Sequence, residues 1–348
     1  MTYDYLIVGQ GLAGTLLHYR LTEAGRSVHV IDGGHTHAAS AVAAGIVNPI
    51  TGWRYVKSWR VETLLPEVER TYAALSTLLG VPIYRPGPIV RAQHAVKDEN
   101  NWALRTTDPA YRPFLAPRAD TATFFPYIAP ARAYGQVQRG GRVDVRTLVH
   151  CYRDYLRAQH ALTEATFDPN DLQISEAGVT YRDLRARRLV FCEGHRAEHN
   201  PWFGYLPFGG AKGEVLIVRI PGARFDRILK QRLFVVPLGD ERYWIGSAYQ
   251  NDYTDERPTA AGRARLVEQL DALLTVPYEI LDHRSAVRPT VQDRRPFLGQ
   301  HPAVPVLYIF NGLGTKGASL GPYFARQLTA HLLSDAPLDA AVDIRRWG

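Results

Sequence analysis

The N-terminal part of the chain consists of two short, largely apolar runs separated by a glycine-rich turn and an amphipathic segment. The runs, at 5–8 and 28–31, are rich in valine, leucine and isoleucine, which is typical of buried strands in a parallel sheet. Between them, leucines at positions 12, 16, 17 and 21 recur with helical spacing, and Gly25 follows. The pattern therefore predicts strand, turn, helix and strand in that order.

The turn between the first strand and the helix has a glycine spacing that fits a dinucleotide. It reads Gly9-x-Gly11-x-x-Gly14, and Asp32 follows the second strand 18 residues after Gly14. We expect Gly9 to allow the tight turn, Gly11 to let a pyrophosphate approach the backbone, and Gly14 to let the helix lie against the strand. A carboxylate at position 32 can accept hydrogen bonds from ribose hydroxyls. The motif predicts a bound dinucleotide but does not distinguish NAD from FAD.

Further along the chain, the periodicity changes in blocks. Amphipathic helices are predicted at 61–79, 143–161, 259–274 and 318–333, and buried strands at 189–194 and 306–310. Alternating strands are predicted at 214–218, 233–236 and 243–246, a strand–turn–strand unit at 82–93, and irregular structure over 97–135. Parallel-sheet units thus open and close the chain, with antiparallel strands between them.

This order predicts a mixed α/β chain (α+β, in two domains). We expect a Rossmann-like dinucleotide-binding domain assembled from the discontinuous segments 1–80, 140–211 and 285–348. Residues 81–139 and 212–284 are expected to form a substrate domain built mainly on an antiparallel sheet.

Composition excludes several classes of protein. Apolar residues make up 46% of the chain and charged residues 22%, which indicates a folded rather than a disordered protein. Two cysteines, Cys151 and Cys192, exclude a disulfide scaffold.

His195 and His199 have ligand-like spacing but no third ligand, so no metal is expected. No apolar run of about 18 residues and no secretory leader is visible, so we expect a cytoplasmic protein without membrane contact.

The motifs taken together resemble the FAD-dependent oxidoreductases of the D-amino-acid oxidase type, and most of all the glycine and sarcosine oxidases. The resemblance runs along nearly the whole chain. Its motifs are Gly9-x-Gly11-x-x-Gly14 with Asp32, Ala43-Ala44-Gly45-Ile46-Val47-x-Pro49, Gly141-x-Val143-Asp144, Lys212-Gly213-Glu214, Val236-Pro237, Arg288-Pro289-x-x-x-Asp293-x-x-Pro296-x-x-Gly299 and the glycine turn 312–317. It implies that the dinucleotide is FAD. No cysteine lies in 288–299, where sarcosine oxidases attach the flavin, so the FAD is expected to be non-covalent.

The resemblance implies a cofactor-binding role for several separate stretches of the chain. The ADP half would lie on the first glycine turn, and the flavin on the segments around 43–47 and 312–317. The residues are Gly9, Gly11, Leu12, Ala13, Gly14, Asp32, Gly33, Ser40, Ala43, Ala44, Gly45, Ile46, Val47, Phe167, Gly194, Arg288, Gly312, Leu313, Gly314, Thr315, Lys316 and Gly317. The turn 312–317 is expected to direct backbone N–H groups at the pyrimidine end of the flavin.

The resemblance also implies the substrate-binding and catalytic residues. Arg288 matches the arginine that clamps the substrate carboxylate in glycine and D-amino-acid oxidases, and a guanidinium can hold both carboxylate oxygens at once. The implied reaction oxidises the C–N bond of a carboxylate-bearing amine, an amino acid or N-substituted glycine, by hydride transfer to flavin N5. Lys316 and Lys57 are expected to assist the reaction of reduced flavin with oxygen or to orient a carboxylate.

Two positions depart from glycine oxidase. Phe234 stands where that enzyme has a tyrosine, and Thr315 where it has a second carboxylate-binding arginine. Each change removes a polar contact to the substrate, so we expect a substrate other than glycine.

Two alternatives remain open on the sequence. The segment 314–338 also resembles the FAD half of a bifunctional enzyme that oxidises the carboxymethylaminomethyl side chain of a wobble uridine in tRNA. The excess of 41 Lys and Arg residues over 34 Asp and Glu residues suits phosphate contacts, as does the aromatic and cationic segment 51–60. The other alternative is an FAD-binding protein without turnover.

Overall fold

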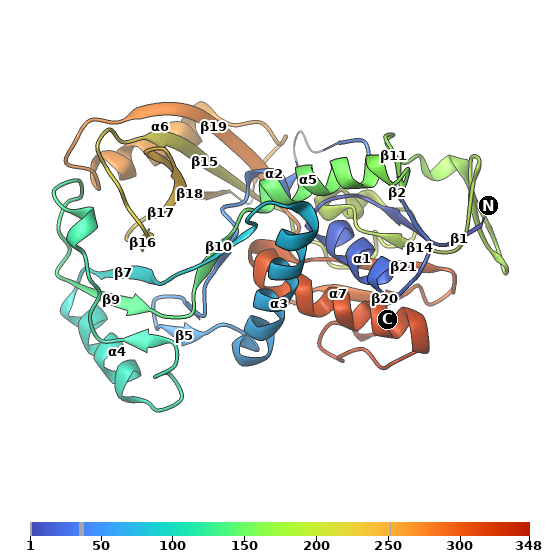
Figure 1. Cartoon of the computed structure of the whole chain (residues 1–348), viewed down its shortest axis with the longest axis horizontal. Helices are drawn as coiled ribbons and strands as arrows, with labels where there is room; N and C mark the ends of the chain where they lie inside the picture. The colour runs from blue at the N-terminus through green and yellow to red at the C-terminus, as the bar shows by residue number, and fades with distance from the viewer. Residues whose placement is uncertain (1, 35–37, 251) are drawn as a thin grey trace.

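A sheet built on parallel strands forms one side of the molecule and contains the N-terminal strand (Figure 1). The computed structural model describes residues 2–34, 38–250 and 252–348. Strands β11, β2, β1, β14 and β21 pair in parallel in that order, β20 pairs with β21, and β13 and β12 continue antiparallel from β14. Their bounds are β1 (Thr2–Val8), β2 (Val28–Ile31), β11 (Leu162–Thr163), β12 (Leu172–Ser175), β13 (Gly178–Tyr181), β14 (Leu184–Phe191), β20 (Phe297–Gln300) and β21 (Leu307–Asn311). Strands from both ends of the chain therefore meet in one sheet.

A second large sheet, antiparallel except where β16 meets β7, forms the other side of the molecule. Its order is β19-β15-β18-β17-β16-β7-β9-β8. The bounds are β7 (Ile89–Gln93), β8 (Leu115–Ala116), β9 (Ala133–Val137), β15 (Ala211–Arg219), β16 (Ile228–Lys230), β17 (Phe234–Gly239), β18 (Arg242–Gln250) and β19 (Glu279–Arg288). Two small sheets join β3 (Ile46–Val47), β10 (Gly141–Val143) and β6 (Tyr84–Pro86), and β4 (Ile50–Thr51) with β5 (Val56–Lys57).

The helices lie mainly around the two large sheets. They are α1 (Leu12–Glu23), α2 (Ala39–Val42), α3 (Val61–Leu79), α4 (Val96–Thr107), α5 (Val145–Ala158), α6 (Ala260–Asp271) and α7 (Gly317–Ser334). Short 3-10 turns are η1 (Ala122–Phe124), η2 (Pro169–Asp171), η3 (Gly194–His199), η4 (Gly314–Lys316) and η5 (Ile344–Trp347). Within the described ranges, no helix combines the length and apolar character needed to cross a bilayer.

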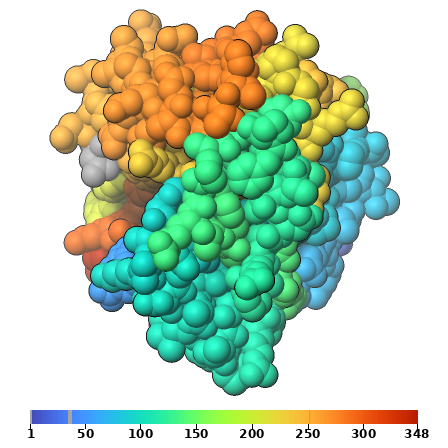
Figure 2. All heavy atoms as spheres, turned by 90° about the vertical axis from the view of Figure 1, so that its left-hand side faces the viewer, coloured from blue at the N-terminus to red at the C-terminus, as the bar shows by residue number. Residues whose placement is uncertain are grey.

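The two faces of the antiparallel sheet have different partners. Leu216, Val235 and Ile245 face α6 and form one core cluster with it. Val215 and Val236, one position along their strands, belong instead to the large core cluster that includes α1, α3, α5 and α7. We call this second face the inner face. Figure 2 looks onto the left-hand side of Figure 1. In it, the teal segment that contains α4 lies below the orange segment that contains α6.

The mixed α/β architecture expected from the pattern is confirmed, with two local corrections. Helix α4 occupies part of the stretch expected to be irregular. Trp102 is its only buried residue, so the helix has no apolar stripe for a periodicity analysis to detect. The strand–turn–strand unit expected at 82–93 is divided between sheets, because β6 pairs with β10 whereas β7 pairs with β9 and β16. The proposed domain boundaries remain a prediction.

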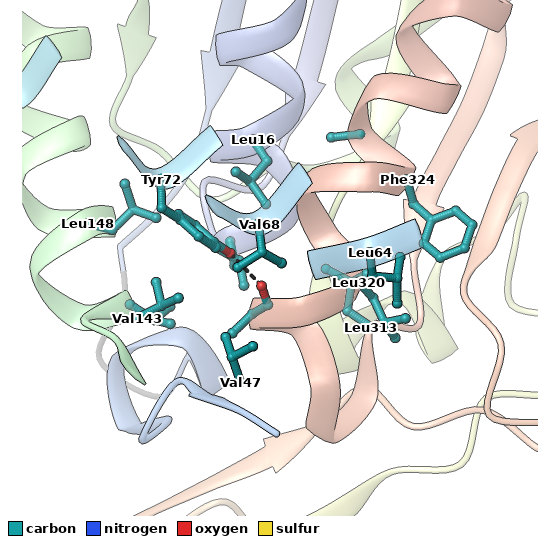
Figure 3. Packing of buried hydrophobic residues seen from close by; sticks show 14 of the residues in the cluster. Leu16, Val47, Leu64, Val68, Tyr72, Val143, Leu148, Leu313, Leu320 and Phe324 are labelled. Atoms are coloured by element: carbon teal, nitrogen blue, oxygen red, sulfur yellow. Dashed lines mark hydrogen bonds between the residues drawn. The ribbon is translucent and has the colours of Figure 1, made fainter. Parts of the chain in front are cut away.

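A side chain from α3 completes the hydrogen bonding of α7. Pro322 lies inside α7 and has no N–H, so the carbonyl of Ala318, four residues earlier, lacks its helical donor. The fully buried Tyr72 supplies one instead: its hydroxyl donates to the Ala318 carbonyl at 3.0 Å. Figure 3 shows the Tyr72 hydroxyl directed at this acceptor, with Leu148 and Leu16 beside the ring. The contact fixes α7, and with it the glycine turn that precedes the helix.

The substitution Tyr72→Phe tests this contact, because it keeps the ring but leaves the buried Ala318 carbonyl without a donor. We expect the free energy of unfolding to fall by about 1–3 kcal/mol in denaturant titrations. Pro322→Ala restores the helical N–H, so in that background Tyr72→Phe should cost much less.

Tyr205→Phe serves as the control, since the Tyr205 side chain is exposed, and it should change stability by less than about 0.5 kcal/mol. An equal cost of Tyr72→Phe in both backgrounds would contradict the assignment.

Candidate active site

A large cavity lies between the parallel sheet and the inner face of the antiparallel sheet. Its volume of about 1310 Å³ exceeds the roughly 300–1,000 Å³ of ordinary small-molecule sites. The lining takes in the turn after β1, the segment around α2, the end of β14, the turn after β21 and residues of β15, β17, β18 and β19. The cavity can therefore hold a dinucleotide together with a second ligand.

The glycine turn after β1 presents bare backbone to this cavity. Gly9 has a φ of +97°, and a Cβ there would press on the Cys192 carbonyl at the end of β14. A Cβ on Gly14 would overlap the Gly9 carbonyl, so Gly14 lets α1 lie against the turn. Gly11 lines the cavity directly before the first residue of α1. These residues fit a pyrophosphate, which needs an exposed backbone and a helix N-terminus.

The carboxylate of Asp32 lies at the cavity but also organises the turn. It accepts from the Gln10 backbone N–H at 2.7 Å and forms an ion pair with Arg153 at 2.6 Å. Both side chains of this pair are almost fully buried. Sequence reasoning missed Arg153, because it belongs to α5, 121 residues away along the chain.

The segment around α2 is clamped between the two sheets. Ser40 Oγ accepts from the Leu12 N–H at 2.9 Å, at the start of α1. On the other side, the Trp244 indole donates to the Val42 carbonyl at 2.9 Å. Gly45 has a φ of +69°, and a Cβ there would overlap the Val143 carbonyl. Trp244 is a cavity-lining residue that no sequence motif identified.

The turn after β21 is tied to the end of β14. The Asn311 side chain donates to the Gly194 carbonyl at 2.9 Å and accepts from the Gly312 N–H at 2.7 Å. The Gly314 N–H donates to the Pro289 carbonyl, and the Lys316 N–H to the Leu313 carbonyl. The expectation that this turn directs its N–H groups at the flavin therefore does not hold for positions 312, 314 and 316, whose N–H groups already have acceptors within the protein.

Most residues expected at the cofactor or substrate lie together in the cavity. Those that line it are Gly9, Gly11, Leu12, Ala13, Asp32, Gly33, Ser40, Ala43, Ala44, Gly45, Ile46, Phe167, Gly194, Arg288, Leu313, Gly314, Thr315, Lys316 and Gly317. Gly14, Val47, Gly312 and Lys57 do not line it. Lys57, which was expected to be catalytic, lies outside the cavity lining, and its ammonium pairs with Glu62 at 2.5 Å; nothing in this geometry supports the expected role.

Arg288 lies on the side of the cavity formed by the antiparallel sheet. It is the last residue of β19, and its guanidinium extends over Gly213 of β15, where a Cβ would overlap it. Tyr249 covers the guanidinium at 4.4 Å from the ring centroid. The Nη1 atom is shielded from solvent and has no hydrogen-bond partner in the described part of the chain. Burial lowers the pKa of the Arg288 guanidinium from its ordinary value.

Glu193 and Lys316, which also line the cavity, have shifted pKa values. Burial raises the pKa of Glu193, at the end of β14, to about 7, and the Asn200 side-chain amide donates to this carboxyl at 2.7 Å. Burial also lowers the pKa of Lys316, with Arg295 and Arg294 adding repulsion. Its ammonium lies 3.3 Å from Ser58 Oγ. Glu193 was missed because a single acid after a strand forms no motif.

The two histidines with ligand-like spacing have other surroundings. His195 and His199 lie in the 3-10 turn η3, and His195 contacts Glu256. Among the residues that the structure describes, no group of three or more His, Cys, Asp or Glu side chains is arranged to hold a metal ion.

Comparisons with known proteins agree with this geometry. Residues 4–331 match the sequence profile of the family described as FAD dependent oxidoreductase. An uncharacterised oxidoreductase of Bacillus subtilis (strain 168) is 24% identical over 95% of each chain, and a glycine oxidase of Bacillus licheniformis is 22% identical over 96% of this chain and 94% of its own.

Two solved structures share the fold. Glycine oxidase from Geobacillus kaustophilus has a TM-score of 0.80 at 22% identity, covering 100% of this chain and 98% of its own. Iminodiacetate oxidase from a Chelativorans species has a TM-score of 0.80 at 21% identity, covering 97% and 98%. Since the family profile spans most of the sequence and includes the glycine turn at the cavity, this chain belongs to the FAD-dependent oxidoreductase family, and its dinucleotide is FAD.

Proposed function

We propose that this enzyme oxidises the C–N bond of an amine that carries a carboxylate, and that Arg288 binds this carboxylate. The observation that carries the proposal is the unpaired guanidinium. It lines the cavity, its Nη1 is shielded from water, and no side chain or carbonyl in the described ranges accepts from that atom. A buried cation without an acceptor is costly, so an anionic ligand at this point is favoured.

The geometry of Arg288 suits a carboxylate in particular. A guanidinium presents parallel N–H groups that match both oxygens of a carboxylate. Gly213 leaves room on one side of the group, and the Tyr249 ring closes another. The carboxylate would thus be held in a fixed direction, which orients the amine carbon of the same molecule.

The neighbouring lining residues would keep the reacting end of the substrate dry. Phe234, Trp244 and Tyr249 place aromatic rings on the same side of the cavity as Arg288. Exclusion of water favours the neutral form of an amine, which is the form that can lose a hydride. When bound, FAD supplies the hydride acceptor for this oxidation.

We assign the remaining residues by where they lie. FAD would be held by the cavity-lining members of the expected set, while Gly14, Val47 and Gly312 shape the backbone behind them. Lys316 would place a partly buried positive charge beside the cofactor, which suits reduction of the flavin because negative charge then develops on the ring.

The relatives guide the choice among the alternatives. Glycine oxidase and iminodiacetate oxidase, by their names, act on small amines that carry carboxylates. Nothing in the relatives described above favours a tRNA partner, so we do not propose one. Phe234 and Thr315 support a substrate that differs from glycine.

Arg288→Met removes the charge and the hydrogen-bond donors but keeps an unbranched, flexible side chain. Hydrogen bonds to charged groups contribute about 1.5–3 kcal/mol each, so we expect kcat/KM for carboxylate-bearing amines to fall about 100-fold or more. Anaerobic reduction of the flavin, followed by its absorbance, measures this across a panel of N-substituted glycines and D-amino acids.

Arg284→Met is the matched control for that experiment. Arg284 lies on the same strand, is partly exposed and pairs with Asp282 at 2.6 Å, so its loss should leave the rates nearly unchanged. If no member of the panel reduces the flavin of the wild-type enzyme, the proposal fails and a binding role without turnover is favoured.

We also predict that the FAD is not covalently attached. Cys192 lines the cavity, but burial raises the pKa of its thiol well above the ordinary value, so the nucleophilic thiolate is not formed. Its carbonyl adjoins Gly9, which places the residue at the expected pyrophosphate rather than at the flavin ring. Acid precipitation should therefore release all of the yellow colour into the supernatant, and a yellow pellet would contradict the prediction.

A further inference from the structure

A pair of cations, Lys230 and Arg91, lies on the inner face of the antiparallel sheet, away from Arg288. Phe234 of β17 is opposite Lys230 of β16, and Lys230 is opposite Arg91 of β7. Side chains two positions apart on a strand share a face. Ile228 and Ile89, two positions from Lys230 and Arg91, belong to the large core cluster on the inner face of the sheet. Both cations therefore project from the inner face.

Neither cation has an acidic partner. Lys230 donates to the Arg232 carbonyl at 2.8 Å, and Arg91 to the Gly52 carbonyl at 3.4 Å. Asp98 attracts Arg91, but no carboxylate in the described ranges is within ion-pair distance of either group. Like charges directly opposite one another in a sheet are destabilising. Burial, with repulsion from Arg91, lowers the pKa of Lys230 to about 8.

The pair adjoins the cavity wall. The Lys230 ammonium lies 4.5 Å from the centroid of the Phe234 ring, and Phe234 lines the cavity. Gly52, which accepts from Arg91, directly follows the lining residue Thr51. An elongated ligand that leaves the cavity past Phe234 and Thr51 would therefore reach the two cations.

We propose that Lys230 and Arg91 form an anion-binding subsite, which receives a carboxylate or phosphate group at the far end of an elongated amine substrate. This inference rests on the proposed function, because it assumes that the near carboxylate of the same substrate is bound by Arg288. The far anion supplies the counter-charge that the protein does not provide for this pair.

The spacing of the strands sets the size of such a substrate. Gly213, beneath the Arg288 guanidinium, lies on β15, and the sheet order places β16 three strands away. At about 4.8 Å per step the separation across the strands is about 14 Å. The register adds about 7 Å along the strands, because Gly246, which is opposite Phe234, pairs with Val215, two positions from Gly213. The total of about 16 Å corresponds to about five residues of extended chain, so the two anionic ends are joined by roughly twelve atoms. The subsite thus selects an amino acid with a long N-substituent or side chain that ends in an anion.

The test compares substrates that share a reactive end and differ only at the far end. An N-substituted glycine with a chain of about twelve atoms is prepared with a terminal carboxylate, a terminal phosphate monoester or a neutral carboxamide. With the holoenzyme, we expect kcat/KM to favour the two anionic ends over the carboxamide by about tenfold or more. The ratio between carboxylate and phosphate then identifies which anion the subsite takes.

Variants assign this preference to the two cations. Lys230→Met and Arg91→Met should each reduce the preference to less than about threefold and leave the rate with the carboxamide nearly unchanged. Lys230→Arg and Arg91→Lys keep the positive charge, so they should retain most of the preference for the anionic substrates. Lys97→Met is the control, since Lys97 is exposed on α4 and lies over Trp53. This variant should retain the full preference for the anionic substrates.

The outcomes separate this inference from the proposed function. Equal rates for all three substrates overturn the subsite while the proposed function stands. If none of the three reduces the flavin, the proposed function fails for this class of substrate. The subsite is then judged by calorimetry: the wild-type enzyme must bind the carboxylate compound more tightly than the carboxamide compound, and equal affinities overturn the subsite. If the methionine variants do not fold, inorganic phosphate must inhibit the anionic substrates more strongly than the carboxamide in the wild-type enzyme, because competition at Arg288 affects all three alike.

Discussion

The burial of the Arg288 guanidinium without a counter-charge is the constraint that organises the proposed active site. A charged group in this position is tolerated because two features accommodate it: Gly213 has no side chain to exclude it, and Tyr249 offers its ring face. Neither feature neutralises the charge. The almost fully buried Arg153, by contrast, is paired with Asp32. The fold thus keeps a carboxylate acceptor away from the one cation that faces the cavity from β19.

The same constraint explains why the site needs strands that are distant in sequence. Gly213 and Arg288 come from the neighbouring strands β15 and β19, which pair along most of their length. Tyr249 is opposite Gly213 on the other neighbour, β18. The three residues therefore meet through sheet register, and any slip of one strand by a single position would turn a side chain to the α6 face.

The cofactor side of the cavity depends on contacts between helices and turns. Asn311 joins the ends of β14 and β21, and the turn after β21 leads into α7. Helix α7 contains Pro322, and Tyr72 of α3 compensates for the missing N–H. Ser40 and Trp244 hold the α2 segment from opposite sides. Each turn that lines the proposed FAD site is thus fixed by a side chain from another part of the chain.

Sequence alone determined the parts of this protein that depend on local order. The glycine turn with Asp32, the amphipathic helices and the alternating strands are short-range patterns, and the ordered motifs around them implied the family, the cofactor and Arg288. The weak pattern of α4, with one buried residue, was not detectable in this way.

The tertiary structure alone decided which charges are paired. Lys57 and Arg288 are both cations in motif regions, yet one pairs with Glu62 outside the cavity and the other is left unpaired within it. Arg153 reaches Asp32 from α5, and Lys230 meets Arg91 across two strands that are far apart in sequence. The energy of a charge depends on its burial and on the groups within a few ångströms, and these distances are set only when the sheets assemble.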